Sequence, residues 1–199
     1  MNNLPVPFNQ LPPHALSKLT LKKQETLFNQ GDSVSGLFYL ESGEVTLSRY
    51  GLAGEEIIIH LARSQETFAE AAIFSEAYHC NAVATENTLI TKISTRTVLE
   101  YAENHPDFSV KLMARFASQI QTLRSQKELI AIRSAHERVY IAISQGLLKD
   151  SIKQFSATIA LSHEATYRAL AKLVSDKRLI KVGRGNYSLP LKNPAHLIK

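Results

Sequence analysis

Apolar and polar residues alternate in short runs between residues 26 and 93, and glycine, asparagine and aspartate separate the runs. The runs include TLF, GLFYL, VTLSRY, EEIIIHL, NAVAT and LITKI, and the turns between them include NQGD, ESGE and GLAG. Short β-rich runs at this spacing predict an antiparallel sandwich or barrel. The segment TFAEAAIFSEA predicts a short helix inserted among the strands.

Helical periodicity follows the last of these strands. Residues 95–104 predict one helix that stops before Pro106, and residues 107–132 predict a much longer one. Along the long helix, one stripe recurs at alternating spacings of three and four, which is the period of a coiled-coil seam. Its members are Met113, Phe116, Ile120, Leu123, Lys127 and Ile130. The stripe can pack on the chain's own barrel, but a length of about 39 Å favours pairing with a second copy.

The last third of the chain predicts helices and then a hairpin. A helix starts near Ser134, which is a suitable N-cap, and a shorter one covers about residues 153–159. The stretch LSHEATYRALAKL predicts a third helix with Ser162 as its N-cap. The stretch RLIKVGRGNYSL predicts two strands joined by a glycine-rich turn at residues 183–186.

The third helix has two different faces. Thr166, Ala169, Leu170, Leu173 and Val174 form a mostly apolar stripe, and the opposite stripe comprises His163, Glu164, Tyr167, Arg168, Ala171 and Lys172. A solvated polar face is the ordinary explanation of such a stripe. The preceding short helix and the following basic hairpin instead favour a winged helix-turn-helix. Arg168 can donate two hydrogen bonds to guanine and Glu164 can accept one from cytosine. We therefore predict contacts to bases from His163, Glu164, Tyr167 and Arg168.

The basic residues are unevenly distributed. The net charge is +5, which alone indicates little, but residues 133–199 contain only four acidic residues and hold the basic excess. A basic small domain beside a larger domain without that excess is typical of nucleic-acid binders. We expect contacts to phosphate from Ser162, Lys172, Lys177, Arg178, Lys181 and Arg184.

Several classes of protein are disfavoured. Cys80 is the only cysteine, so one chain forms no internal disulfide and no cysteine-only metal or iron–sulfur site, and a reducing cytoplasm is the simplest compartment. No apolar run approaches the ~20 residues of a membrane span, and we expect no secretion signal. The sequence has no Walker loop, no G-x-S-x-G and no metal-ligand cluster, so we predict no enzyme.

Two stretches carry a resemblance to the CRP/FNR superfamily, which includes the cyclic-AMP receptor protein. LFNQGDSVSGLFYLESGEVTLSR resembles that family's first barrel segment. SHEATYRAL is similar to its recognition-helix pattern S-R-E-x-x-x-R-x-L, with Ser162, Glu164, Arg168 and Leu170 matching and His163 replacing the usual arginine. The resemblance covers about residues 20–190.

The resemblance implies an α+β chain in three parts. Residues 1–106 would form an antiparallel jelly-roll β-barrel of the cyclic-nucleotide-binding type. Residues 107–133 would form a long dimerisation helix and hinge, and residues 134–199 a winged helix-turn-helix. The implied function is that of a bacterial, homodimeric transcription regulator that binds near-palindromic double-stranded DNA, with RNA polymerase as a further candidate partner. The sequence does not distinguish an activator from a repressor. The alternative is a small-molecule-binding regulatory subunit that acts on a protein partner.

The effector pocket departs from the family pattern. In members that bind cyclic AMP, a Gly-Glu pair and a later Arg-Ser pair hold the ribose phosphate. Glu70 matches the glutamate, but Ala69 replaces the glycine, and Tyr78 and His79 stand at the Arg-Ser positions. A phosphate without its guanidinium binds poorly, so we expect a weak response to cyclic AMP or none. Iron–sulfur sensing is not expected either, because the cysteine cluster is missing.

Other candidate sensor residues lie on the long helix and near Cys80. Leu123 and Arg124 stand where cyclic-AMP responders carry threonine or serine, so both join the candidate effector pocket. His60, His79 and Cys80 are candidates for a metal, haem or thiol sensor. If His79 and Cys80 lie on a strand, their side chains point to opposite faces and cannot share one ion. Two further explanations stay open. The barrel can bind an organic ligand as effector, or the protein can bind DNA without any effector.

Overall fold

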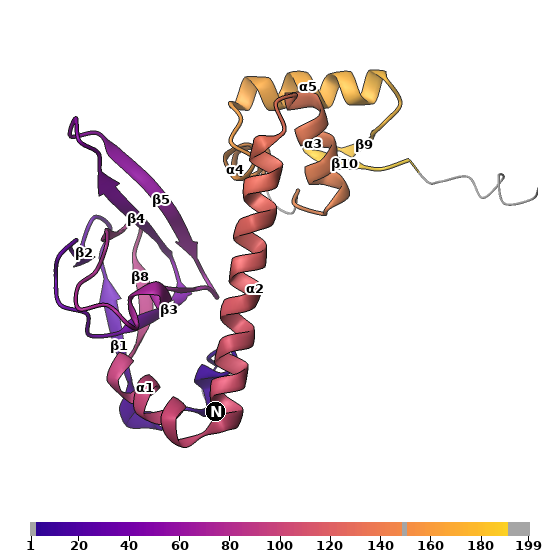
Figure 1. Cartoon of the computed structure of the whole chain (residues 1–199). Helices are drawn as coiled ribbons and strands as arrows, with labels where there is room; N and C mark the ends of the chain where they lie inside the picture. Colours follow the sequence, from indigo (N-terminus) through magenta and orange to yellow (C-terminus); the bar gives the residue numbers. More distant parts are fainter. Residues whose placement is uncertain (1–2, 149–150, 191–199) are drawn as a thin grey trace, which may run out of the picture. The chain divides into compact units, whose positions relative to one another are not determined.

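The computed structural model describes residues 3–148 and 151–190 (Figure 1). The chain divides into two compact units, Met1–Arg115 and Phe116–Lys199. The boundary falls inside one long helix, whereas the sequence placed boundaries at residues 106 and 133. The first ten residues of that helix belong to the first unit, and two of them, Phe108 and Leu112, are buried.

The first unit contains two four-stranded antiparallel sheets. Their orders are β1-β8-β3-β6 and β2-β7-β4-β5. The strands are β1 (Leu16–Leu21), β2 (Thr26–Phe28), β3 (Leu37–Ser42), β4 (Glu44–Tyr50), β5 (Glu56–Arg63), β6 (Thr67–Phe68), β7 (Asn81–Ala84) and β8 (Thr88–Ile93). The prediction of short antiparallel strands is confirmed. The ribbon of β4 and β5 extends beyond its neighbours (Figure 1).

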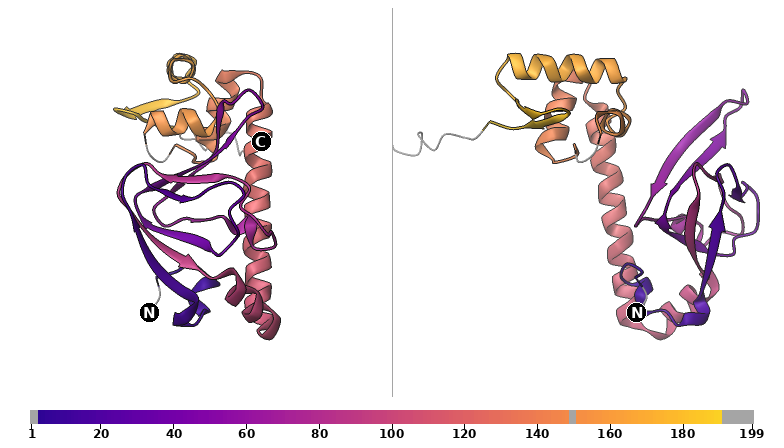
Figure 2. Two further views of the ribbon diagram at one scale, coloured as in Figure 1. Left: turned by 90° about the vertical axis from the view of Figure 1, so that its left-hand side faces the viewer. Right: turned by 180° about the vertical axis from the view of Figure 1, so that it is seen from behind.

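The strands of the first unit form two layers (Figure 2), and buried side chains from both sheets make one core. Successive side chains of a strand point to opposite faces, so Phe38 and Leu40 of β3 face this core while Tyr39 does not. The core members are Phe28, Phe38, Leu40, Val45, Leu47, Ala62, Phe68, Ala72, Tyr78, Cys80, Ala82 and Ile90. The four aromatic residues stack in a series, with ring centroids 3.8 Å apart for Tyr78 and Phe28, 5.5 Å for Phe28 and Phe38, and 5.3 Å for Phe38 and Phe68.

The structure differs from the sequence-based prediction at two places in this unit. Strand β1 lies before residue 26, where no strand was predicted. The helix predicted over TFAEAAIFSEA is wrong, because that stretch forms β6 and a single 3-10 turn, η3 (Glu70–Ala72). Ala69 takes a left-handed conformation, with φ of 63°, which interrupts any helix that passes through it.

Short helical turns precede the strands, and two α-helices follow them. The turns are η1 (Phe8–Gln10) and η2 (Pro13–Ala15), and the helices are α1 (Thr95–Asn104) and α2 (Pro106–Ala131). Ser94 caps α1 by accepting a hydrogen bond from the Thr97 amide at 3.2 Å. Both helices agree with the predicted ranges to within one residue. Within residues 3–148 and 151–190, no helix is both long enough and apolar enough to cross a membrane.

The second unit continues from α2 into three short helices and a hairpin. They are α3 (Ala135–Ser144), α4 (Ile152–Thr158), α5 (His163–Ser175), β9 (Ile180–Gly183) and β10 (Asn186–Ser188). Ser134 caps α3 by accepting from the Glu137 amide at 3.3 Å, as predicted. The helices enclose a second core of Leu129, Val139, Ala142, Ile143, Ile152, Phe155, Ile159, Ala169, Leu170, Leu173 and Leu179.

Candidate nucleic-acid interface

Helix α5 has one buried face and one exposed face, as its sequence predicted. Thr166, Leu170 and Leu173 are fully buried, and Ala169 is nearly so. The Ser162 hydroxyl accepts a hydrogen bond from the Ala165 amide at 3.1 Å, so Ser162 is the N-cap. The exposed face comprises His163, Glu164, Tyr167, Arg168, Ala171 and Lys172.

The exposed face carries groups suited to base edges. Glu164 lies in the first turn of α5, and Arg168 lies one turn later. Neither forms an ion pair with any residue that the structure describes, so both keep their hydrogen-bonding capacity. The rings of His163 and Tyr167 meet edge to face with centroids 4.9 Å apart, which orders two further polar tips on the same face.

Exposed basic side chains surround the C-terminal end of α5 and the hairpin. Lys177, Lys181 and Arg184 are exposed and have no acidic partner among the described residues. Lys172 pairs with Asp176 at 3.3 Å, which partly neutralises it. Of these four basic residues, Lys177, Lys181 and Arg184 thus remain for an anionic ligand.

Arg178 does not belong with those cations. Its guanidinium donates two hydrogen bonds to the Glu137 carboxylate, one of them from Nη2 at 3.1 Å, and lies 4.0 Å from the centre of the Tyr140 ring. The hydrogen bonds from Arg178 lower the pKa of Glu137. Arg178 is therefore not one of the phosphate contacts that we propose, because it ties the segment after α5 to α3.

Arg138 is an important residue that sequence reasoning missed. From α3, its Nη1 donates to the carbonyls of Ile159 at 3.1 Å and Ala160 at 3.2 Å, in the turn between α4 and α5. Its Nε donates to the carbonyl of Ile132 at 2.9 Å, where α2 ends. One side chain thus joins the end of α2 to the turn before α5. Ala160 in that turn has φ of 50°, a left-handed conformation that favours glycine.

The candidate effector residue Glu70 is already paired within the first unit. Its side chain is 10% exposed, and its carboxylate lies 3.8 Å from Nη2 of Arg115, which projects from α2. Thr67 donates a hydrogen bond to Glu70 and accepts one from Arg115. The guanidinium of Arg115 also lies 5.5 Å from the centre of the buried Phe8 ring. Sequence reasoning missed Arg115, although its spacing from Phe108 and Leu112 places it on the buried side of the helix.

Tyr78, at the family's arginine position, is part of the core. Its ring stacks on Phe28 with centroids 3.8 Å apart. Its hydroxyl donates to the Gly36 carbonyl at 2.7 Å and accepts from the Gly36 amide at 3.2 Å. A phenol fixed by these contacts, and not a guanidinium, therefore occupies the position that the resemblance assigns to the phosphate partner.

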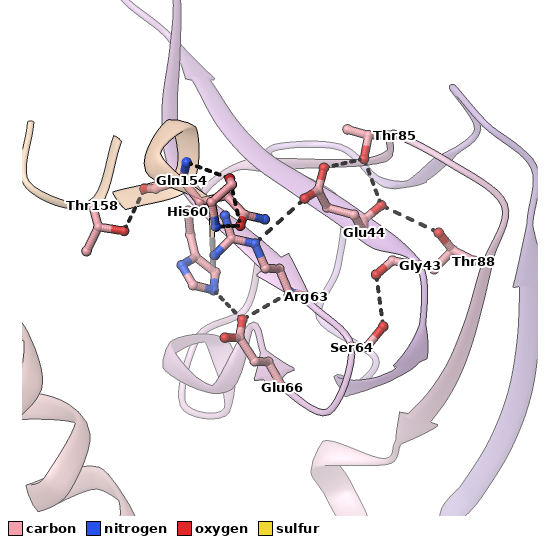
Figure 3. A network of polar contacts seen from close by, with 11 residues as sticks. Gly43, Glu44, His60, Arg63, Ser64, Glu66, Thr85, Thr88, Gln154 and Thr158 are labelled. Carbon is pink, nitrogen blue, oxygen red and sulfur yellow. Dashed lines mark hydrogen bonds and ion pairs between the residues drawn. The ribbon is translucent and has the colours of Figure 1, made fainter. Parts of the chain in front are cut away.

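The described positions of His60, His79 and Cys80 do not form a shared metal site. His79 and Cys80 lie in a bend before β7 and not on a strand; His79 is exposed and contacts Ser75 at 2.9 Å, while Cys80 is buried. Burial raises the pKa of the Cys80 thiol, although Arg49 opposes the shift, so the thiol is protonated and weakly reactive at neutral pH. His60 lies 3.7 Å from Glu66 (Figure 3). The described residues contain no group of three or more potential metal ligands.

The seam predicted on α2 is largely exposed in the single chain. Met113 is 61% exposed, Ile120 49%, Leu123 64% and Ile130 44%. Arg124 and Lys127 are also exposed. Leu123 and Arg124 belong to the second unit, whereas Glu70, Tyr78 and His79 belong to the first.

The pairing of Arg115 and Glu70 leads to a prediction about stability. Arg115→Ala leaves the nearly buried carboxylate of Glu70 without its cation, and we expect the unfolding free energy to fall by about 1–3 kcal/mol. Arg96→Ala is the matched control, because Arg96 forms an exposed pair with Glu100 at 2.8 Å, whose loss has little effect. Chemical denaturation of both variants measures the difference. Equal, small losses in both variants would show that the Arg115 contact is not stabilising.

Comparison with known proteins places the first unit in a family. Residues 18–105 match the model of the cyclic nucleotide-binding domain. An uncharacterized protein of Haemophilus influenzae is 30% identical over 102 residues, which are 51% of this chain and 79% of that protein. The chain belongs to the cyclic nucleotide-binding domain family. Within that family it is distantly related to the CRP/FNR transcription regulators.

Two named relatives and one solved structure extend the comparison. The transcriptional activator protein anr of Pseudomonas aeruginosa is 29% identical over 119 residues, 60% of this chain but only about half (49%) of the activator. The cyclic AMP receptor protein of Thermus thermophilus is 26% identical over 168 residues, 80% of this chain and 77% of that protein. FixK2 from Bradyrhizobium japonicum matches in structure with a TM-score of 0.62 and 17% identity, over 89% of this chain and 93% of FixK2. The match to FixK2 shows that the shared fold extends beyond the two sheets and over the helices that follow them.

Proposed function

We propose that the protein is a homodimeric, sequence-specific DNA-binding transcription regulator of the CRP/FNR type that does not require cyclic AMP. The observation that carries the proposal is the exposed face of α5. Glu164 and Arg168 lie on it without acidic or basic partners, and α4 and the β9–β10 hairpin flank the helix in the order of a winged helix-turn-helix. The relatives named as activators support the same conclusion.

In the proposed complex, α5 enters the major groove. Arg168 donates two hydrogen bonds to the O6 and N7 atoms of a guanine, and Glu164 accepts from the N4 amino group of a cytosine. His163 and Tyr167 contact neighbouring base edges or phosphates. Lys177, Lys181 and Arg184 hold the sugar–phosphate backbone, and Ser162 and Lys172 add contacts at the two ends of the helix.

The proposed dimer forms along α2. The exposed apolar residues Met113, Ile120, Leu123 and Ile130 pair with the same residues of a second copy, and Phe116 and Lys127 complete the seam. A two-fold dimer presents two copies of α5 to successive major grooves about 34 Å apart, so the preferred site is near-palindromic. Ile57, Ile58 and Ile59 on β5 are also exposed and add apolar surface that a partner would cover.

Independence from cyclic AMP is proposed from the contents of the effector region. Glu70 is engaged by Arg115 and Thr67, and Tyr78 stands at the position that the resemblance assigns to the phosphate-binding arginine. A cyclic nucleotide would have to displace Arg115 from Glu70 and would gain no guanidinium for its phosphate in return. The proposed regulator therefore binds DNA without that nucleotide.

Salt dependence of DNA affinity tests the proposed function against a regulatory subunit that binds protein. If Lys177, Lys181 and Arg184 of each protomer contact phosphate, the dimer makes about six such contacts, so the logarithm of the binding constant should fall with the logarithm of salt with a slope of about −5. The measurement is fluorescence anisotropy with a labelled duplex at several salt concentrations. An affinity too weak to measure at low salt would contradict DNA binding and favour the regulatory subunit.

A further inference from the structure

A cavity of about 470 Å³ lies in the first unit, on the face of the β1-β8-β3-β6 sheet that points away from the aromatic core. Tyr39, Glu41 and Thr91 of β3 and β8 form its floor, and the N-terminal segment forms one wall. The lining residues are Asn3, Leu4, Pro13, Leu16, Ser17, Lys18, Tyr39, Glu41, Ser42, Gln65, Leu89 and Thr91. This cavity is distinct from the effector region around Glu70 and Tyr78.

The floor of the cavity is a connected set of polar groups centred on Glu41. The Tyr39 hydroxyl donates to Oε1 of Gln65 at 2.7 Å, and Nε2 of Gln65 donates to the Glu41 carbonyl at 3.4 Å. Thr91 and Lys18 both donate to Oε1 of the Glu41 carboxylate. The other carboxylate oxygen, Oε2, accepts no hydrogen bond from any residue in the described part of the chain. A three-quarters buried carboxylate thus keeps one acceptor atom for a ligand.

The rim and walls have a different character from the floor. The Lys18 side chain is 63% exposed, so its ammonium group can turn toward a ligand while Thr91 continues to hold Glu41. Leu4 is buried, Leu16 and Leu89 are half-buried, and together with Pro13 they make apolar walls. The cavity therefore combines an anion at depth, a movable cation at the rim and apolar surface beside them.

We propose that this cavity binds a small zwitterion with an apolar side chain, either a free amino acid or a dipeptide. The ligand's ammonium group donates to Oε2 of Glu41, and its carboxylate accepts from the Lys18 ammonium. Its side chain packs on Leu16 and Leu89. Each ligand charge meets an opposite charge, which limits the cost of removing both from water. The volume lies in the usual range of small-molecule sites, about 300–1,000 Å³.

This inference goes beyond the proposed function and does not depend on DNA binding, because the lining residues all lie in the first unit. The core between the sheets offers no such site, since Phe28, Phe38 and Tyr78 stack there. The site on the outer face also needs no displacement of Arg115 from Glu70.

Isothermal titration calorimetry on the full-length protein tests the inference. The probes are leucine, methionine, phenylalanine and the dipeptide leucyl-leucine, with N-acetyl-leucine amide as the analogue that lacks both charges. We expect at least one free amino acid or the dipeptide to bind, and the uncharged analogue not to bind. Comparing the free amino acids with the dipeptide shows which of the two kinds of ligand the cavity takes. Absence of binding by every zwitterion, or equal binding by the uncharged analogue, would overturn the proposal.

Two variants and a control locate the binding. Glu41→Gln removes the charge that receives the ammonium group and should weaken binding at least tenfold. Ser42→Trp fills the cavity from an exposed position and should abolish binding without touching the charges. Glu103→Gln, an exposed glutamate on α1 outside the lining, should bind as the wild type does. Thermal unfolding confirms that each variant is folded, and unchanged binding in both cavity variants would overturn the site.

Discussion

Substituting Arg168 by alanine should reduce specific DNA affinity by roughly 30-fold or more while leaving non-specific affinity almost unchanged. A bidentate contact between arginine and guanine contributes about 1–3 kcal/mol of discrimination, and the proposed dimer makes two of them. The fold should tolerate the change, because the Arg168 side chain is exposed and alanine is the best helix former. Anisotropy titrations with a selected site and a scrambled duplex measure both affinities.

Arg184→Ala is the matched control for this experiment. Arg184 is an exposed arginine of the hairpin turn and is proposed to contact phosphate. Its loss should weaken specific and non-specific binding by the same factor and should make the salt slope shallower by about 2, one contact from each protomer. If Arg168→Ala also weakened both kinds of binding equally, Arg168 would be a phosphate contact and not a reader of bases.

Leu123→Glu should convert the dimer into monomers, with a dissociation constant raised roughly 100-fold or more. In the proposed seam the change removes two apolar side chains, each worth about 1.5–3 kcal/mol on burial, and places two carboxylates against apolar surface. The folded chain itself should be little affected, because Leu123 is 64% exposed in the single chain. Sedimentation equilibrium over a range of concentrations measures the change in mass.

Gln121→Glu supplies the control for the dimer. Gln121 is also exposed and lies on the same helix, but it is not a member of the seam. It adds the same charge as Leu123→Glu and should leave the dimer intact. A dimer that survived Leu123→Glu would show that the chains pair elsewhere, with the exposed isoleucines of β5 as the next surface to examine.

The elements that sequence reasoning predicted well are those with local signals. Ser134 and Ser162 cap the helices that they were expected to start, and the apolar stripe through Leu170 and Leu173 is the buried face of α5. Capping and periodicity depend on residues a few positions apart, so one sequence contains them. The short segment around Ala69 was misjudged because its apolar composition fits a helix, while its left-handed backbone does not.

The contacts that sequence reasoning missed join residues distant in the chain. Arg115 meets Glu70 across 45 positions, and Arg178 meets Glu137 across 41. Whether an arginine is free for phosphate or held by a carboxylate depends on the fold, so Arg178 and Lys177 look alike in the sequence. The cavity beside Glu41 was missed for the same reason, because its walls come from the N-terminal segment and its floor from β3 and β8.

Selection from a random duplex library, with purified protein at fixed salt and with or without cyclic AMP, tests the central claim most directly. The account predicts enrichment of a near-palindrome whose half-sites lie one helical turn apart, in the absence of the nucleotide. It also predicts a guanine and a cytosine among the fixed positions, read by Arg168 and Glu164. Enrichment only when cyclic AMP is present would contradict the account of the effector region, and no enrichment in either condition would contradict the proposed DNA-binding regulator.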